Sequence, residues 1–397
     1  MNVLYVNHTS EVSGAERSLL GLLGGLPDGV RPLLATPPGR LADAAAALGV
    51  PTTSIAGTAG SLRVHPLHTP RALAELSLAA AQVRRAARRH RAELVHANSI
   101  RAGIVLGLAR LAPAASVVHV RDCLPPGALS SATMRLIGAS ATSVLANSRY
   151  TAASVRAAAP RARARLEVVH NSVELDRWDP SRIDRARVRA ALGAAGSRGV
   201  LLGVVAQLSP WKGQDTAIEA LELVCEQGID AHLLLIGSAK FRARATRFDN
   251  EAYVRRLHAL VDAAGLGERV SFLGEREDVP ELVRAIDMLL LPSWEEPFGR
   301  AVIEAMALEV PVLATSVGGP AEILSDGVEG MLLAPREAPA WASAIAALAA
   351  DPERRARMGR AGRARVEREF TLERHVKNVL EVYERALATL AKGVQTP

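Results

Sequence analysis

Residues 289–324, LLLPSWEEPFGRAVIEAMALEVPVLATSVGGPAEIL, form the stretch that decides the fold. A leucine run, a Pro-Phe-Gly turn, an apolar helical run and a second short strand follow one another, and this order is typical of a parallel sheet with helical connections. The adjacent acids Glu295 and Glu296 lie against the turn, and Glu304 lies within the helical run. Because acids are costly in an apolar setting unless something there requires them, these residues are candidates for a functional site.

The same alternation of short strands and alanine-rich helices continues along most of the chain. It predicts parallel sheets that are covered by helices on both faces. A polar, arginine-rich stretch at 176–199 separates two series of six strands. The predicted strands are 2–6, 31–36, 94–97, 116–120, 143–147 and 166–170, and then 200–206, 231–237, 270–274, 287–293, 311–315 and 330–334. We therefore expect an α/β fold of two doubly wound, Rossmann-like domains.

The domains predicted by this division are residues 1–180 and residues 198–370, followed by a C-terminal segment, 371–397. The stretch 370–390 has the period of an amphipathic helix. Its apolar side contains Val376, Val379, Leu380, Val382 and Tyr383. Since ligands of open parallel sheets bind beyond the carboxyl ends of the strands, functional residues are expected directly after strands.

The composition of the 397 residues, 49% hydrophobic and 22% charged, is that of a globular protein. No apolar run reaches membrane-spanning length, and the first residues, MNVLYVNHTS, lack the pattern of a signal peptide. The only two cysteines, Cys123 and Cys225, have neither disulfide nor metal-ligand spacing. These features predict a cytoplasmic protein and give no indication of a metal site.

The net charge of +7 raises the question of nucleic-acid binding. Only four of the 48 basic residues are lysines, a bias that is typical of a GC-rich genome, and aromatic residues for base stacking make up only 3% of the chain. We therefore expect no nucleic-acid partner. One basic segment, 82–91, continues an apolar helical stretch. It is either a solvated helix face or a peripheral contact with the inner face of an anionic membrane.

Two loops that follow predicted strands have features of anion sites. Gly14, in SEVSGAERSLL, begins a helix after the first strand, where backbone amides can point at an anion. Lys212, in QLSPWKGQD, combines a point charge with a strand-to-helix turn and suits a phosphate. Each also has an ordinary interpretation, as a plain helix start and as a surface lysine beside a turn glycine.

A third loop precedes the helix that contains Glu304. The turn at 297–299 places the amides of Gly299 and Arg300 at a helix start, where amides have no acceptor within the helix. Glu296 precedes that start and Glu304 lies about one turn into the helix, so both carboxylates can reach one ligand. The ordinary interpretation is a helix cap at Glu296 and a solvated side chain at Glu304.

The segment 296–307, EPFGRAVIEAMA, resembles the E-x7-E motif of the retaining glycosyltransferases of family 4, which have the GT-B fold. The resemblance covers nearly the whole chain, in the family's order and spacing. It implies two Rossmann-like domains that face a central cleft, and a C-terminal helix that crosses back to the N-terminal domain. Its further motifs are SGAERSLL, ANSRYTAASV, VVHNSVELDRWDP, SPWKGQ, FLGEREDVPELV and TSVGGPAEIL.

This resemblance assigns roles to the residues of the third loop. Glu304 matches the acid that binds the ribose hydroxyls of the donor. Glu296 matches the acid that contacts the donor sugar, and Phe298 and Gly299 match residues whose backbone amides bind sugar hydroxyls. Arg300 stands at the start of the helix whose amides face the diphosphate.

Other matching residues complete the donor site that the resemblance implies. Lys212 matches a basic residue on the diphosphate. Its usual partner, an arginine, is replaced here by Gln207, which leaves one charge fewer on the leaving group. Gly14 matches a glycine loop near the phosphates or the donor sugar, and Glu275 and Arg276 stand where the base is expected.

Many members of the family carry a histidine after the fourth strand of the N-terminal domain, close to the anomeric centre. The corresponding stretch here is VVHVRD, 117–122. Both His119 and Arg121 are candidates for this place, because period-two alternation puts their side chains on the same face of the strand.

The resemblance implies a retaining, metal-independent hexosyltransferase without a cofactor. It would move a sugar from a nucleotide-diphosphate sugar, a UDP-sugar by family frequency, to a hydroxyl acceptor in cell-envelope glycan, glycolipid or natural-product biosynthesis. The acceptor site is expected in the N-terminal domain, at loops such as 57–70 and 121–135. The alternatives are a GT-B sugar-nucleotide epimerase or hydrolase, which lacks the E-x7-E pattern, and a basic nucleic-acid-binding protein.

Overall fold

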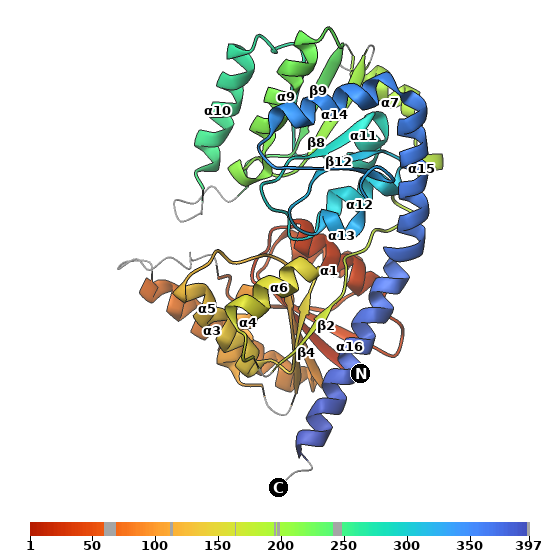
Figure 1. Cartoon of the computed structure of the whole chain (residues 1–397). Coiled ribbons are helices and arrows are strands. Elements are labelled where there is room, and N and C mark those ends of the chain that lie inside the picture. The colour runs from red at the N-terminus through yellow and green to blue at the C-terminus, as the bar shows by residue number, and fades with distance from the viewer. Residues whose placement is uncertain are drawn as a thin grey trace. The chain divides into compact units, whose positions relative to one another are not determined.

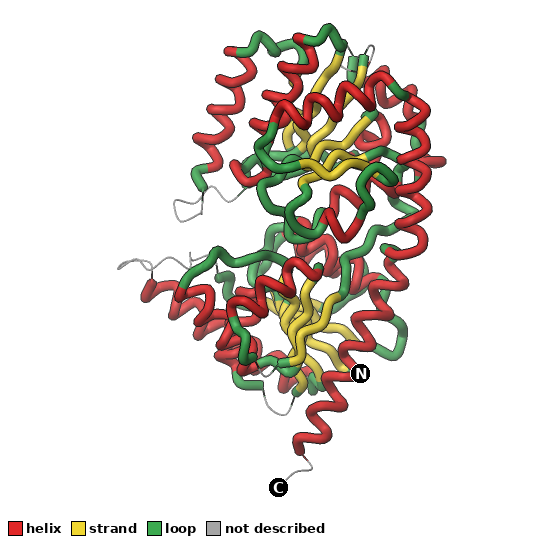
Figure 2. Tube along the Cα trace, viewed as in Figure 1, coloured by secondary structure: helices red, strands yellow, loops and turns green. Residues whose placement is uncertain are grey.

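The computed structural model describes residues 1–58, 69–111, 114–162, 164–193, 196, 199–240 and 248–394 (Figure 1). The chain forms two compact units, each built on one parallel sheet with helices on both faces (Figure 2). Unit 1 consists of Met1–Ser172 and Leu372–Pro397, and unit 2 consists of Val173–Thr371.

The sheet of unit 1 has the strand order β3-β2-β1-β4-β5-β6-β7, and every neighbouring pair is parallel. The chain therefore winds outward from β1 in one direction and then crosses over to β4, which is the doubly wound pattern. The strands are β1 Asn2–Val6, β2 Arg31–Thr36, β3 Thr52–Ser54, β4 Leu94–Ala97, β5 Ala115–Val120, β6 Ser143–Ala146 and β7 Arg165–Val168.

Two layers of helices cover this sheet, because each helix has one apolar stripe to bury. The first layer packs on one face, through apolar side chains of α3 Thr69–His90, α4 Ile100–Ala109, α5 Ala128–Ser140 and α6 Arg149–Ala158. The second layer packs on the other face, through α1 Gly14–Gly24, α2 Arg40–Ala47 and α16 Leu372–Val394.

The C-terminal helix α16 is an integral part of unit 1. Its predicted apolar side is confirmed, since Val376, Val379, Val382 and Tyr383 are buried and Leu380 packs beside them.

Polar contacts fix the helix further. The Tyr383 hydroxyl lies 2.7 Å from Nδ1 of His96 on β4, and Arg385 forms an ion pair of 2.6 Å with Glu167 on β7. Burial lowers the pKa of His96 to about 3 and raises the pKa of Tyr383, so both groups are neutral where they meet.

The sheet of unit 2 has the strand order β10-β9-β8-β11-β12-β13 and is again parallel throughout. Its strands are β8 Val200–Val205, β9 Ala231–Ile236, β10 Val270–Gly274, β11 Met288–Leu291, β12 Val312–Thr315 and β13 Gly330–Leu333. Its helices are η1 Pro180–Arg182, α7 Arg185–Ala191, η2 Pro210–Lys212, α9 Gln214–Glu226, α10 Asn250–Ala263, α11 Val279–Ala285, α12 Arg300–Ala307, α13 Pro320–Ile323, α14 Ala338–Ala350 and α15 Pro352–Glu369.

All twelve predicted strands are confirmed, with ends that differ by at most two residues. The prediction missed β3, which has three polar residues, lies at the edge of the sheet and pairs with β2 alone. A strand of this kind buries almost no apolar surface, so its sequence lacks the pattern on which the prediction relied. The arginine-rich stretch that separates the two series folds with unit 2, and its helix α7 packs against α11.

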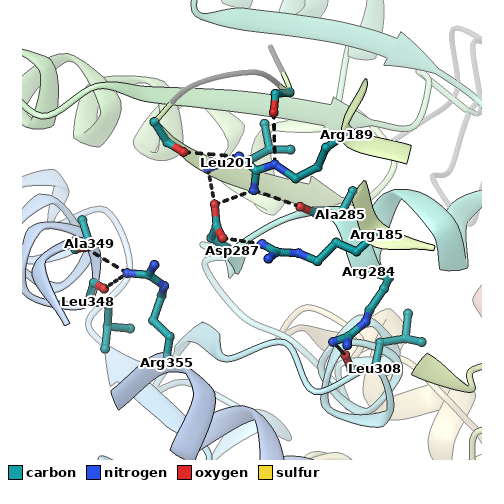
Figure 3. Close-up of polar contacts among 12 residues, drawn as sticks. Arg185, Arg189, Leu201, Arg284, Ala285, Asp287, Leu308, Leu348, Ala349 and Arg355 are labelled. Carbon is teal, nitrogen blue, oxygen red and sulfur yellow. Dashed lines mark hydrogen bonds and ion pairs between the residues drawn. The ribbon is translucent and has the colours of Figure 1, made fainter. Parts of the chain in front are cut away.

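The carboxylate of Asp287, immediately before β11, holds that stretch in place (Figure 3). It accepts a hydrogen bond of 2.8 Å from the amide of Leu201, and it forms ion pairs with Arg189, at 2.9 Å, and Arg185. Burial alone would raise the pKa of Asp287, but the Leu201 amide and the two arginines outweigh it and lower the pKa. This site lies at the amino ends of the strands, so it serves stability rather than ligand binding.

We predict that Asp287→Asn lowers the free energy of unfolding of unit 2 by about 1.5–3 kcal/mol near neutral pH, because charged hydrogen bonds are lost. Since the folded pKa is depressed, the contribution of Asp287 is complete above the unfolded pKa of about 3.9 and is lost as the pH falls through the folded pKa. The difference between the melting temperatures of wild type and variant should therefore shrink below about pH 4. The exposed Asp262→Asn serves as the control, and an equal effect of both variants would contradict the assignment.

Candidate functional site

The carboxyl edge of the unit 2 sheet brings Lys212 and Glu296 together. Lys212 ends η2 after β8, Glu296 lies in the loop after β11, and the Lys212 Nζ to Glu296 Oε2 distance is 2.6 Å. Their side chains are only 13% and 10% exposed. The hydroxyl of Ser293 donates to the same carboxylate oxygen at 3.1 Å, and the Trp211 ring lies 3.9 Å from Nζ. Lys212 and Glu296 therefore form a largely buried ion pair at the carboxyl ends of the central strands.

The backbone of Glu296 is fixed by a neighbouring loop after β12. Its amide donates to the carbonyl of Val317 at 3.2 Å, and its carbonyl accepts from the amide of Gly319 at 2.8 Å. Gly318 has a φ of 111°, and a Cβ there would lie 2.1 Å from the Glu296 carbonyl oxygen. Only glycine permits this approach, so the two loops form one rigid edge.

Helix α12 begins at this edge without a side-chain cap. Its N-cap is Gly299, with a φ of 99°, and its first turn contains no acid. Amides of a first turn have no acceptor within the helix and carry the positive end of the helix dipole, so this start is suited to an anion. A Cβ on Gly299 would lie 3.5 Å from Cγ of Glu296, which places the Glu296 side chain beside the helix start.

Glu304 lies one turn into α12 and is buried, between Ile303 and Ala305, which are both fully buried. Its carboxylate is paired with Arg300, whose Nη2 and Nε lie 2.7 and 3.2 Å from Oε1. The prediction of an acid in an apolar setting is therefore correct in its geometry. The structure groups Lys212 and Glu296 at the start of α12 and holds Glu304 in an ion pair one turn further along.

Phe298, the remaining predicted residue of this loop, has a buried side chain that packs on Phe370, with ring centroids 6.3 Å apart. Its ring anchors the loop, so a role toward a ligand falls to its backbone.

Three other predicted residues of unit 2 lie at the same edge of the sheet, after β8 and β10. The carbonyl of Gln207 accepts a hydrogen bond of 2.9 Å from the buried side chain of Gln214. Glu275 forms an ion pair of 2.8 Å with Lys240, and Arg276 forms a two-pronged pair with Asp278 at 2.6 and 2.8 Å. The side chains of Glu275 and Arg276 thus contact neighbouring residues, and their part in binding a base stays a prediction.

In unit 1, Gly14 and Arg121 both lie at the carboxyl edge of the sheet. Gly14 is the first residue of α1, whose cap is formed by Ser13 and the buried carboxylate of Glu16. Arg121 follows β5 and is buried; its Nε donates to Oδ1 of Asn98 at 3.0 Å and its Nη1 donates to Oδ1 of Asn171 at 2.8 Å. A guanidinium is thus held in a fixed orientation by two neutral side chains.

His119 occupies a different place from Arg121, although both were candidates for one role. It lies within β5, its ring is fully buried, and the ring centroid lies 5.5 Å from that of His96. Among the described residues neither ring nitrogen has a hydrogen-bond partner, and burial lowers the pKa of His119 well below its usual value. Because β5 ends at Val120, only Arg121 reaches beyond the strand.

Sequence reasoning missed the buried asparagines that support Arg121. Asn98 donates to Oδ1 of Asn7 at 3.0 Å, and Asn7 donates to Glu16 at 3.3 Å, so a chain of polar groups joins the ends of β1, β4 and β5. A signal was present: the triplet Ala-Asn-Ser occurs at 97–99 and again at 146–148. In both copies the asparagine is buried and the serine caps the following helix.

The described ranges contain no group of three or more histidine, cysteine, aspartate or glutamate side chains that could hold a metal ion. No helix within them is long and apolar enough to cross a membrane. Of the loops expected to form an acceptor site, 57–70 falls largely on residues 59–68, which lie outside the described residues, and 121–135 leads into α5.

Two family models match adjoining parts of the chain. Residues 12–177 match Glycosyltransferase Family 4, and residues 185–365 match Glycosyl transferases group 1. The chain therefore belongs to the family 4 glycosyltransferases, and its fold is GT-B.

Similar proteins include enzymes of this kind. A D-inositol 3-phosphate glycosyltransferase of Salinispora tropica is 33% identical over 235 residues, which are 56% of this chain and 47% of that protein. Spore coat protein SA of Bacillus subtilis is 31% identical over 257 residues, 62% of this chain and 66% of that protein. The matched part thus spans about half to two thirds of the length of these curated relatives.

A solved structure resembles the whole chain. Anabaena Alr3699/HepE in complex with UDP-glucose is 28% identical, with a TM-score of 0.83, and the match covers 97% of this chain and 100% of that one. A sucrose-phosphate synthase of Thermosynechococcus elongatus, 21% identical with a TM-score of 0.77 over 98% of this chain and 99% of that one, shares the fold.

We predict that Gly318→Ala distorts the edge that holds Glu296, whereas Gly327→Ala does not. Both glycines have positive φ, but a Cβ on Gly327 would meet nothing within 4 Å. Gly318→Ala should therefore lower the free energy of unfolding by about 1–3 kcal/mol more than Gly327→Ala, because overpacking adds to the shared backbone strain. Calorimetric unfolding of both variants measures this, and equal losses would show that the close approach of the loops is not needed.

Proposed function

We propose that the protein transfers a sugar from a UDP-sugar to a hydroxyl group of an acceptor. The observation that carries this proposal is the pairing of Lys212 with Glu296 at the uncapped start of α12, followed one turn later by the buried Glu304. The similarity to a protein that binds UDP and UDP-glucose, over nearly the full length of both chains, supports the choice of donor.

In the proposed donor site, different residues of unit 2 bind the ribose, the diphosphate and the sugar of the donor. The Glu304 carboxylate binds the ribose hydroxyls, since a carboxylate accepts two hydrogen bonds from adjacent hydroxyls. The diphosphate lies against the first-turn amides of α12 and the ammonium group of Lys212. Glu296 and the backbone amides of Phe298 and Gly299 contact the hydroxyls of the sugar.

The proposed reaction breaks the bond between the anomeric carbon and the oxygen of the β-phosphate. The pair of electrons leaves with the UDP, the acceptor oxygen forms the new bond to the anomeric carbon on the same face, and its proton passes to the departing phosphate. The configuration is then retained. Negative charge grows on the phosphate in the transition state, so Lys212 and the α12 amides lower the barrier most.

Unit 1 is the proposed acceptor domain, with Arg121 and the Gly14 loop at its sheet edge. We further propose that the transfer requires no metal ion, because Lys212 and the helix start supply the positive charge, and that the acceptor belongs to cell-envelope glycan, glycolipid or natural-product synthesis in the cytoplasm. Unchanged activity in the presence of a chelator is the expected result, and loss of activity that Mg²⁺ restores would overturn the metal-free mechanism.

Kinetics of two variants separate the proposed roles. Lys212→Ala should lower kcat about 10²–10³-fold with little change in KM, because it acts on charge that develops in the transition state. Glu304→Ala should mainly raise the donor KM, by about 10- to 100-fold, because charged hydrogen bonds to the ribose are lost in ground state and transition state alike. The exposed Lys377→Ala is the control and should match the wild type.

The donor is tested by thermal unfolding in the presence of UDP, GDP and ADP. A nucleotide at 100 times its dissociation constant should stabilise the protein by about 2.7 kcal/mol, and we expect UDP to do so in the wild type and far less in Glu304→Ala. Stabilisation by none of the three nucleotides would contradict the proposal. Release of the sugar into water, with no transfer to any alcohol, would instead identify a hydrolase.

A further inference from the structure

The outer surface of the α3–α4–α5 layer in unit 1 differs from the rest of the protein. We call this surface the basic–leucine face and define it by the exposed side chains of α3, α4 and α5. The three helices pack side by side, α3 on α4 and α4 on α5, and they bury their inner stripes against the same face of the sheet (Figure 1). Their outward stripes therefore form one continuous surface.

The charge on these helices is almost entirely of one sign. Their sequences contain seven arginines and a single acid, Glu75. The net charge of the whole chain is +7, so the excess of positive charge in this layer alone nearly equals that of the complete protein. Elsewhere acids and bases are close to balance. Five of these arginines, Arg84, Arg85, Arg88, Arg89 and Arg135, are exposed in the described part of the chain, and a surface with this excess of positive charge attracts an anionic partner.

Helix α3 exposes apolar side chains in its amino half and basic side chains in its carboxyl half. At its amino half Leu73 and Leu78 are exposed, at 58% and 54% of their surface. At its carboxyl half Arg84, Arg85, Arg88 and Arg89 are exposed and form no ion pair with any described residue. Exposed leucines followed by arginines with long flexible stems are typical of helices that lie at a lipid–water interface.

The neighbouring helices extend the apolar part. Leu108 on α4 and Leu129 and Leu136 on α5 are exposed. A Cβ on Gly107 would lie 3.4 Å from Cγ of Leu136, so Leu136 of α5 lies against α4. Five of the seven exposed large apolar side chains in the described part of the chain thus belong to this one face.

We propose that the basic–leucine face docks peripherally on an anionic lipid bilayer. The arginines bind the lipid phosphates and the leucines enter the boundary between headgroups and acyl chains. Nucleic acid fits less well, because the three helices contain no aromatic residue on which a base could stack. The docking does not depend on the transferase activity, and the residues involved are distinct from those of the proposed donor site.

The test is co-sedimentation of the full-length protein with vesicles of two compositions. One is phosphatidylcholine alone, and the other is phosphatidylcholine mixed with phosphatidylglycerol. We expect binding to the anionic vesicles only, and weaker binding at high salt, because exposed charges are screened. Equal binding to both compositions, or to neither, would overturn the proposal.

Paired variants locate the contact. Arg88→Glu with Arg89→Glu should lower the partition coefficient at least about 30-fold, since each basic residue near an anionic surface contributes about fivefold. Leu73→Ser with Leu78→Ser should lower it at least about tenfold. The matched control is Arg255→Glu with Arg360→Glu, two exposed arginines of unit 2 that form no ion pair with a described residue, and it should bind as the wild type does.

All three double variants alter exposed side chains, so their melting temperatures should equal that of the wild type and a loss of binding cannot arise from unfolding. Binding by the α3 variants that equals the wild type would overturn the proposal. The same holds if the wild type binds random duplex DNA but not anionic vesicles, or if the face proves to be covered by a second copy of the chain in solution.

Discussion

The two backbone hydrogen bonds that join Glu296 to the loop of Val317 and Gly319 are the constraint on which the donor edge of unit 2 depends. They couple the ends of the neighbouring strands β11 and β12, and they fix the backbone from which both the Glu296 side chain and the start of α12 project. The coupling is possible because Gly318 lets one loop pass within contact of the other. The proposed donor site thus rests on a backbone that two strand-end loops hold together.

The buried charged groups at the two ends of that sheet have different partners. At the amino ends, Asp287 is surrounded by an amide and two arginines, which lower its pKa and join α7 to β11. At the carboxyl ends, Lys212 and Glu296 form a close pair beside an uncapped helix start. In the first arrangement the carboxylate of Asp287 has all its partners within the protein. The second combines opposite charges with backbone donors, which is the arrangement suited to a ligand with a diphosphate and several hydroxyls.

Much of the fold could be predicted because parallel strands buried on both faces read as short apolar runs, and all twelve such runs became strands. The polar edge strand β3 could not be predicted, since it buries little apolar surface. Within the site, the acids at 296 and 304 stood out by their apolar surroundings. The polar network behind Arg121 did not, because Asn7, Asn98 and Asn171 are far apart in sequence and meet only when the sheet has formed. His119 and Arg121 both stay candidates for the place near the anomeric centre; the predicted end of β5 at residue 120 is confirmed, and only Arg121 lies beyond it.

The central claim is that a nucleoside diphosphate lies between Lys212, the first turn of α12 and Glu304. A crystal structure of the protein with bound UDP tests it most directly. The expected result has diphosphate oxygens within hydrogen-bonding distance of the α12 amides and of the Lys212 ammonium group, and ribose hydroxyls on the Glu304 carboxylate. A nucleotide bound elsewhere, with Glu304 still paired to Arg300 and remote from the ribose, would contradict it.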